Sequence, residues 1–195
     1  HAGHENTRVF RECAKIGSEL QQLDNTLVGS RSDARAAIVF DWDNWWAIEH
    51  SSGLTVDLRY VQEIEKYYDA FYSRNLQVDF ISVEMDLANY EIVVAPVMYL
   101  LHPGYAARLE HFVEQGGTLV TTTFSGIVNE SDLVTPGGYP GELRELLGIW
   151  VEEIDAPMEH QRNRVVMTSQ LGELEGPYDC GVLCDVIHLE GAESF

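Results

Sequence analysis

Residues 41–46, Asp-Trp-Asp-Asn-Trp-Trp, join two carboxylates to three indoles directly after an apolar run. Carboxylates at Asp41 and Asp43 could act as acid and base or bind a cation, but capping of the next segment through backbone amides is favoured. Indole rings stack on sugars or anchor protein interfaces. We expect Trp42, Trp45 and Trp46 to fill an interface. A sugar platform and packing within the domain are the alternatives, and Asn44 is grouped with this site.

A second possible site is Thr-Phe-Ser-Gly at 123–126, which resembles a strained nucleophile turn. That turn requires glycine two residues before the serine, and Thr123 occupies the position. We therefore assign Ser125 no catalytic role, and place Phe124 and Ser125 with the tryptophans as an interface or the wall of a sugar pocket. Residues 96–99, Pro-Val-Met-Tyr, lack the cysteine that an amidotransferase of similar topology needs.

Metal and cofactor sites are not expected. Loop 41–46 lacks the glycines that let a backbone approach phosphates. The histidine and cysteine pairs lack a third or fourth ligand nearby in sequence. These pairs are His1 with His4, His102 with His111, and Cys180 with Cys184.

The composition restricts the partners of the chain. With 32 acidic and 12 basic residues, its net charge of −20 repels nucleic acid and anionic membranes. Three cysteines, Cys13, Cys180 and Cys184, do not form a disulfide framework and fit a reducing compartment. We find no membrane-spanning run and no signal peptide, and expect a cytoplasmic protein.

Hydrophobic periodicity predicts the elements that position these residues. Apolar residues three and four apart predict a helix over 7–23, followed by a polar linker over 24–35. Short apolar runs then alternate with helical patterns up to about residue 155, which predicts an α/β fold with a doubly wound, mostly parallel sheet. The expected strands are 36–40, 76–83, 92–95, 118–124 and 149–154, with further candidates at 165–169 and 182–189, and the expected helices are 58–74, 103–116 and 143–147.

Five distinctive sequence segments follow one another along the chain. They are HAGHENTRVFRE, AIVFDWDNWWAIE, VVAPVMYLL, GGTLVTTTFSGIVNESDLV and GGYPGELRELLGIWVEE. In that order the chain resembles the middle portion of the glycoside hydrolase family 42 β-galactosidases over nearly its whole length.

This resemblance implies a place within a longer enzyme. Residues 1–34 are similar to the closing segment and last helix of a (β/α)8 barrel plus a linker. Residues 35–195 are similar to the trimerisation domain, with flavodoxin-like or class I glutamine amidotransferase-like topology. The partners implied are two further copies in a homotrimer, the barrel, and a galactoside only through the parent enzyme. Both ends of the chain look cut.

The same resemblance bears on catalysis. Family members hydrolyse terminal β-galactosides with retention through two glutamates on barrel strands, and no position here matches them. Retention requires two carboxyl groups ~5 Å apart across the sugar. We therefore expect a non-catalytic oligomerisation domain that is inactive alone. A carbohydrate-binding or sensing module that uses Trp42, Trp45 and Trp46 is the alternative.

Overall fold

The computed structural model describes residues 4–50 and 53–195, and the chain divides into two compact units. The first ends at Asp33 and the second runs from Ala34 to Phe195. No helix among the described residues is both long and apolar enough to cross a bilayer.

The first unit contains one long helix, α1 (Arg8–Leu27). The side chain of Thr7 caps it by accepting a hydrogen bond from the backbone N–H of Phe10 at 3.3 Å. The helix continues through 24–27, which the sequence assigned to a linker, because residues 18–28 contain neither glycine nor proline before Gly29, where φ is +83°. None of its residues is buried, so its apolar face has no partner within the unit.

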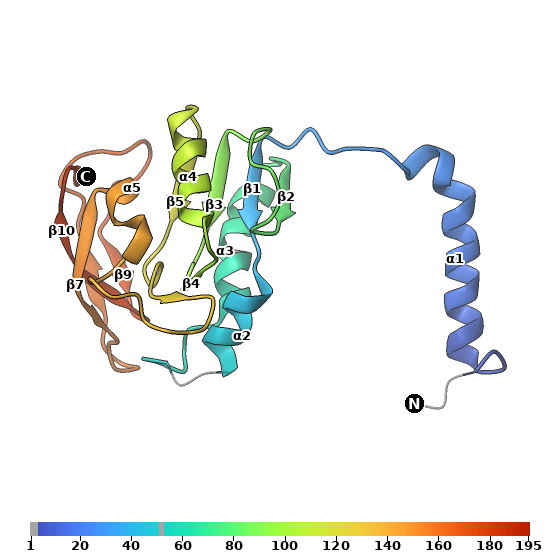
Figure 1. Ribbon diagram of the computed structural model, residues 1–195, viewed down its shortest axis with the longest axis horizontal. Helices are drawn as coiled ribbons and strands as arrows, with labels where there is room; N and C mark the ends of the chain where they lie inside the picture. The colour runs from blue at the N-terminus through green and yellow to red at the C-terminus, as the bar shows by residue number, and fades with distance from the viewer. Residues whose placement is uncertain (1–3, 51–52) are drawn as a thin grey trace. The chain divides into compact units, whose positions relative to one another are not determined.

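A four-stranded parallel sheet forms the centre of the second unit (Figure 1). The strand order β2-β1-β3-β5 is that of flavodoxin-like folds and confirms the predicted doubly wound α/β class. Every residue of β1 is buried, as the continuous apolar run required. The strands are β1 (Ala36–Val39), β2 (Val78–Ile81), β3 (Ile92–Ala95) and β5 (Thr118–Thr121).

Helices cover both faces of this sheet. Ala37 and Val39 of β1 pack in one core cluster with Leu109 of α4 (Tyr105–Glu114). Ile38 points to the opposite face and packs in a second cluster with Ile64 of α3 (Tyr60–Tyr72). Alternation along the strand therefore divides the core into two layers. Helix α4 begins two residues after Pro103, because Gly104 has φ +73° and precedes its first turn.

Two further features correct the sequence analysis. Residues 42–46 are not a loop, because they begin helix α2 (Trp42–His50). The short parallel pair β4 (Leu100–Leu101) and β6 (Val128–Asn129) was not predicted at all. Two-residue strands carry too little periodicity to be read from sequence.

The C-terminal part adds antiparallel pairs beside the parallel sheet. A 3-10 turn, η1 (Gly141–Leu143), and α5 (Arg144–Leu147) lead into β7 (Ile149–Asp155), which pairs with β10 (Cys184–Leu189) in a sheet of its own. Figure 1 shows this pair on the β5 side of the unit. The predicted strand at 165–169 is wrong beyond its first residue, because β8 (Asn163–Val165) ends there and pairs with β9 (Tyr178–Cys180).

Candidate functional site

Asp41 connects the end of β1 to the start of α2. Its backbone N–H donates to the hydroxyl of Tyr60 at 2.9 Å. Its carbonyl accepts the first helical hydrogen bond, from Trp45 N–H at 3.1 Å, and its carboxylate Oδ1 accepts a long hydrogen bond from Asp43 N–H at 3.4 Å. Asp41 therefore caps α2, as an acidic residue at a helix N-terminus does.

Asn44 is fully buried and joins α2 to β4. Its Nδ2 donates to Asp41 Oδ2 at 2.6 Å and to the carbonyl oxygen of Leu100 at 3.0 Å, while Leu100 N–H donates to its Oδ1 at 2.7 Å. The same Nδ2 lies 3.5 Å from the sulfur of Met98. This amide therefore fixes the orientation of the Asp41 carboxylate.

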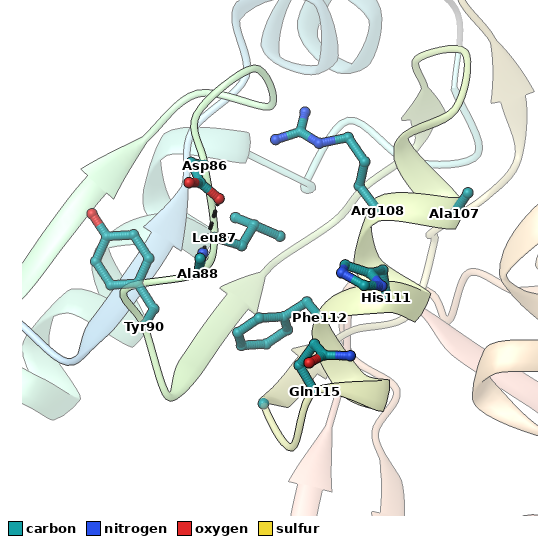
Figure 2. A pocket seen from close by; sticks show the side chains of 10 residues that line it. Asp86, Leu87, Ala88, Tyr90, Ala107, Arg108, His111, Phe112 and Gln115 are labelled. Carbon is teal, nitrogen blue, oxygen red and sulfur yellow. Dashed lines mark hydrogen bonds between the residues drawn. The ribbon is translucent and has the colours of Figure 1, made fainter.

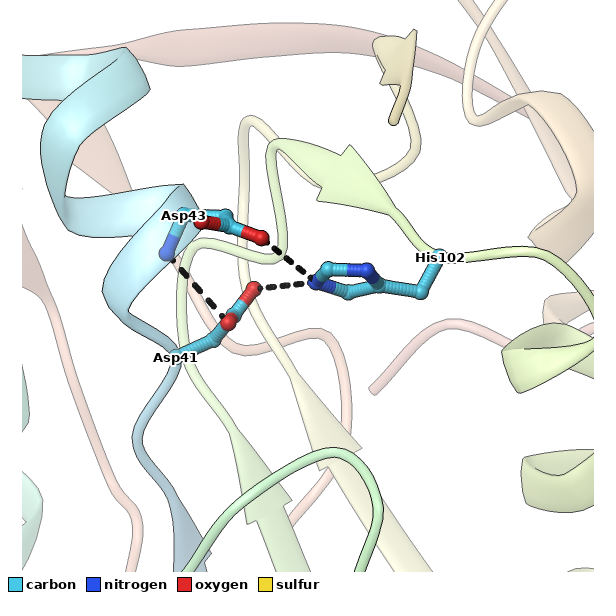
Figure 3. Close-up of side chains that lie close together, drawn as sticks. All are labelled: Asp41, Asp43 and His102. Atoms are coloured by element: carbon cyan, nitrogen blue, oxygen red, sulfur yellow. Dashed lines mark hydrogen bonds and ion pairs between the residues drawn. The ribbon is translucent and has the colours of Figure 1, made fainter. Parts of the chain in front are cut away.

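His102 directly follows β4 and completes a cluster with the two aspartates (Figure 3). Its Nε2 lies 3.0 Å from Asp41 Oδ2 and 3.7 Å from Asp43 Oδ2. The sequence predicted the aspartates as a pair but gave His102 no role with them. Asp41 and His102 are 61 positions apart in sequence, and β4 brings them together, which sequence periodicity could not reveal.

A cavity of about 390 Å³ opens beside this cluster. Within residues 4–50 and 53–195, the hydroxyl of Tyr105 is the one buried side-chain polar atom without a hydrogen-bond partner. Burial raises the pKa of Tyr105, Arg108 lowers it in part, and the charge of Asp41 raises it again. The guanidinium of Arg108 donates to the carbonyl oxygens of Val83 and Met85. The lining residues are Asp41, Trp42, Asp43, Ser82, Val83, Glu84, His102, Pro103, Tyr105 and Arg108.

The three neighbouring tryptophans divide between core and surface. The Trp42 ring lies 5.2 Å from that of Trp45 and 6.1 Å from that of Trp46, measured between centroids. Trp45 packs against the second core cluster. Trp42 and Trp46 remain 56% and 52% exposed. We call these two rings the tryptophan face.

Phe124 and Ser125 are both buried in the loop after β5. Phe124 has φ +62°, stacks on Tyr99 with centroids 4.9 Å apart, and shares a core cluster with Trp45. The Ser125 hydroxyl accepts hydrogen bonds from Met98 N–H and from Thr121 Oγ1, each 3.1 Å long. Ser125 thus ties two loops together, and it does not reach the tryptophan face.

The turn after β3 has the shape of a nucleophile turn without a nucleophile. Val97 has φ +47°, which is rare for a β-branched residue. Its N–H donates to Thr122 Oγ1 at 2.8 Å, and its side chain is buried. An amidotransferase would place its reactive thiol at such a turn, whereas here the side chain is aliphatic.

A larger cavity of about 540 Å³ lies between α4 and the loop that follows β2 (Figure 2). Arg108, His111 and Phe112 of α4 face Leu87 and Tyr90 across it. No motif in the sequence pointed to this cavity. Of the terminal pair, His1 lies outside the described residues and His4 is exposed.

Comparison with known proteins gives a consistent result. The family model described as "Beta-galactosidase trimerisation domain" matches residues 34–195. The chain is 58% identical to beta-galactosidase BgaP of Planococcus sp. (strain L4), over 100% of this chain and 29% of that protein. It is 43% identical to beta-galactosidase Pbg of Clostridium perfringens, over 99% of this chain and 28% of that protein.

Solved structures show the same similarity. The beta-galactosidase from Bacillus circulans sp. alkalophilus matches with a TM-score of 0.83 and 60% identity, over 99% of this chain and 29% of that one. The cold-adapted beta-galactosidase from Rahnella sp. R3 matches with a TM-score of 0.81 and 43% identity, over 99% of this chain and 29% of that one. The chain thus spans less than a third of the length of these relatives.

Proposed function

Because this chain belongs to the β-galactosidase trimerisation-domain family, we propose that it joins the subunits of a longer β-galactosidase into a homotrimer. The family match favours this assembly role over a carbohydrate-binding module. In this proposal, hydrolysis of terminal β-galactosides belongs to the parent enzyme, and residues 1–34 form the closing segment and last helix of its barrel plus a linker. The unpartnered apolar face of α1 supports that assignment, since the barrel would cover it.

The observation that carries the proposal is the tryptophan face. Its two rings are half-exposed, which leaves roughly 100 Å² each for a partner to cover. At ~25 cal/mol per Å², burial of each ring contributes about 2 to 3 kcal/mol to association. The Trp45 ring packs against that of Trp42, which in turn packs against that of Trp46, and tryptophans are typical anchors of protein interfaces.

The carboxylates of the described site are poorly placed for glycoside hydrolysis. Retaining glycosidases need two accessible carboxyl groups ~5 Å apart across the sugar, and one oxygen of Asp41 does lie within 4.8 Å of one of Asp43. However, Asp41 is buried and already bonded to Asn44 and His102, so it cannot attack a sugar. Substrate cleavage is therefore assigned to the parent, and this chain should not hydrolyse a chromogenic galactoside.

The state of the cysteines supports a cellular location for the parent enzyme. Cys13, Cys180 and Cys184 are all free thiols, which supports a reducing compartment. We place the parent enzyme in the cytoplasm.

Sedimentation tests the interface. We expect wild-type chain to form a trimer that dissociates on dilution, and the double variant Trp42→Ala/Trp46→Ala to sediment as a monomer. Loss of about 4 to 6 kcal/mol corresponds to roughly a thousandfold or greater weakening. A matched control, Leu133→Ala/Met158→Ala, removes exposed apolar area elsewhere and should leave the trimer intact. A trimer of unchanged stability in the tryptophan variant would refute the interface.

A further inference from the structure

We propose that Asp41, Asp43 and His102 bind one divalent transition-metal ion, Zn²⁺ in preference to Mg²⁺, at the wall of the cavity beside α2. Among the residues that the structure describes, no other three carboxylate, imidazole or thiol side chains come together in this way. This inference does not depend on the trimer. It concerns a site on one subunit, and its tests measure ion binding.

The positions of the three donor atoms fit an ion. They lie within 4.8 Å of one another, with Nε2 of His102 at 3.0 and 3.7 Å from the two carboxylate oxygens. Ligand atoms that each lie ~2.1 Å from a zinc ion are separated from one another by roughly 3 to 4 Å. Figure 3 shows the imidazole edge and both carboxylates directed at the same point. Small side-chain rotations suffice to place an ion there.

The donor types determine the class of ion. An imidazole nitrogen with two carboxylate oxygens suits Zn²⁺, and also Mn²⁺, whereas Mg²⁺ prefers oxygen ligands and retains its waters. Asn44 holds Asp41 Oδ2 through a 2.6 Å hydrogen bond, so the most buried ligand is oriented in advance. Asp43 is half-exposed and His102 is only partly covered, which leaves a path for the ion from the cavity.

An independent observation at the same cavity points to a bound species. Tyr105 is one of the residues that line the cavity, and its buried hydroxyl has no hydrogen-bond partner and lies near enough to Asp41 to sense its charge. Buried hydroxyl groups are almost always hydrogen-bonded. Three protein ligands leave the fourth position of a tetrahedral zinc ion to water. The oxygen of such a water supplies the acceptor that the Tyr105 hydroxyl lacks.

Charges around the cavity favour a cation. Asp41, Asp43 and Glu84 contribute three carboxylates, against one permanent positive charge on Arg108. That guanidinium is turned toward the carbonyl oxygens of Val83 and Met85. A simple hydrogen bond between His102 and Asp41 would account for the 3.0 Å contact, but it would leave Asp43 and the Tyr105 hydroxyl unexplained.

Calorimetry tests the proposal. The 195-residue chain is first treated with a chelator and is then titrated with zinc chloride and, separately, with magnesium chloride. We expect one zinc ion per chain, with magnesium bound at least ~100-fold more weakly. His102→Ala and Asp43→Asn should each weaken zinc binding by ~100-fold or more. Asp43 is half-exposed, so Asp43→Asn should retain the helical circular dichroism of the wild type.

Two matched controls separate this site from other histidines. His111→Ala removes the exposed imidazole 3.8 Å from Glu114 on α4, and His4→Ala removes one member of the terminal His-x-x-His pair. Both should bind zinc as the wild type does. Absence of zinc binding in the wild type, equal affinity in all variants, or loss only in His4→Ala would each overturn the proposal.

Two further measurements test the geometry. Cobalt(II), which takes the place of zinc, should give the visible absorption of a tetrahedral site in the wild type and lose it in His102→Ala. Tyr105→Phe keeps the buried ring, and it should weaken zinc binding by ~3- to 10-fold if the hydroxyl donates to the metal-bound water. An octahedral cobalt spectrum in both proteins, or zinc affinity unchanged in Tyr105→Phe, would contradict the proposed arrangement.

Discussion

Replacing Asn44 with alanine removes an amide that connects α2, β4 and the Asp41 carboxylate. The N–H and C=O groups of Leu100, a residue only 4% exposed, both lose their partner. Each unpaired buried group costs about 1 to 3 kcal/mol, and loss of the bond to the carboxylate adds a similar amount. Water entering the vacated space recovers part of this cost. We expect the free energy of unfolding to fall by about 3 to 5 kcal/mol.

Urea unfolding measures this loss. With an m-value of ~2 kcal/mol per M, the midpoint should fall by roughly 1.5 to 2.5 M while the slope stays unchanged. Tryptophan fluorescence is a suitable signal because Trp45 lies one residue from the substitution and packs in the core. Asn89→Ala, which changes the same residue type at an exposed position, is the control and should unfold as the wild type does.

Hydrogen exchange adds a local measurement. The amide of Leu100, bonded at 2.7 Å to Asn44 in the wild type, should lose its protection first. A loss of less than 1 kcal/mol in Asn44→Ala, or an equal loss in Asn89→Ala, would show that this amide does not link the elements. Asn44 would then not be what orients the Asp41 carboxylate either.

Two further predictions concern the loops after β3 and β5. Gly126→Ala should lower the free energy of unfolding by at least ~2 kcal/mol more than Gly137→Ala does. Both glycines have positive φ, +69° and +105°, so both substitutions strain the backbone by about 1 to 3 kcal/mol, but only at Gly126 would the new Cβ lie 1.9 Å from the carbonyl oxygen of Pro140, whereas at Gly137 it meets no atom within 4 Å; equal thermal shifts would refute this steric argument. Burial and a hydrogen bond to Asp132 raise the pKa of Tyr99 from 10.0 to about 12, so the stabilising contribution of this hydroxyl is complete below pH 10 and is lost as the pH rises through about 12. Tyr99→Phe should abolish that part of the alkaline loss of stability, and an identical pH profile in both proteins would count against it.

The strands of the parallel sheet could be predicted from the hydrophobic pattern, because each strand produces its pattern within its own few residues. The strand at 92–95 was predicted at its observed bounds, since Pro96 follows a continuous apolar run. The predicted bounds of the first strand, of α3 and of α4 lie within a few residues of the observed ones. The main error in this region was to treat residues 42–46 as a loop, although Asp41 is a good N-cap and the helix follows directly.

The candidate site could be predicted only in part, because its contacts are distant in sequence. Asp41 and Asp43 stand out as a pair, but the third member, His102, is positioned by a two-residue strand and by the hydrogen bonds of Asn44 to Leu100. Such a strand has no periodic signal of its own. The unpartnered hydroxyl of Tyr105 is likewise a property of the packed structure.

The carboxyl edge of a doubly wound sheet is where such folds bind ligands, and here its polar groups are largely used within the chain. The hydroxyl of Ser125 accepts the N–H of Met98, and the amide of Asn44 is bonded to the backbone of Leu100. The turn that would carry a nucleophile holds Val97 instead. With these groups bonded within the chain, the large rings that α2 presents outward are those of Trp42 and Trp46. A tryptophan side chain has only two rotatable bonds and so loses little conformational entropy when a partner covers it, which is a physical reason for this face to act in assembly.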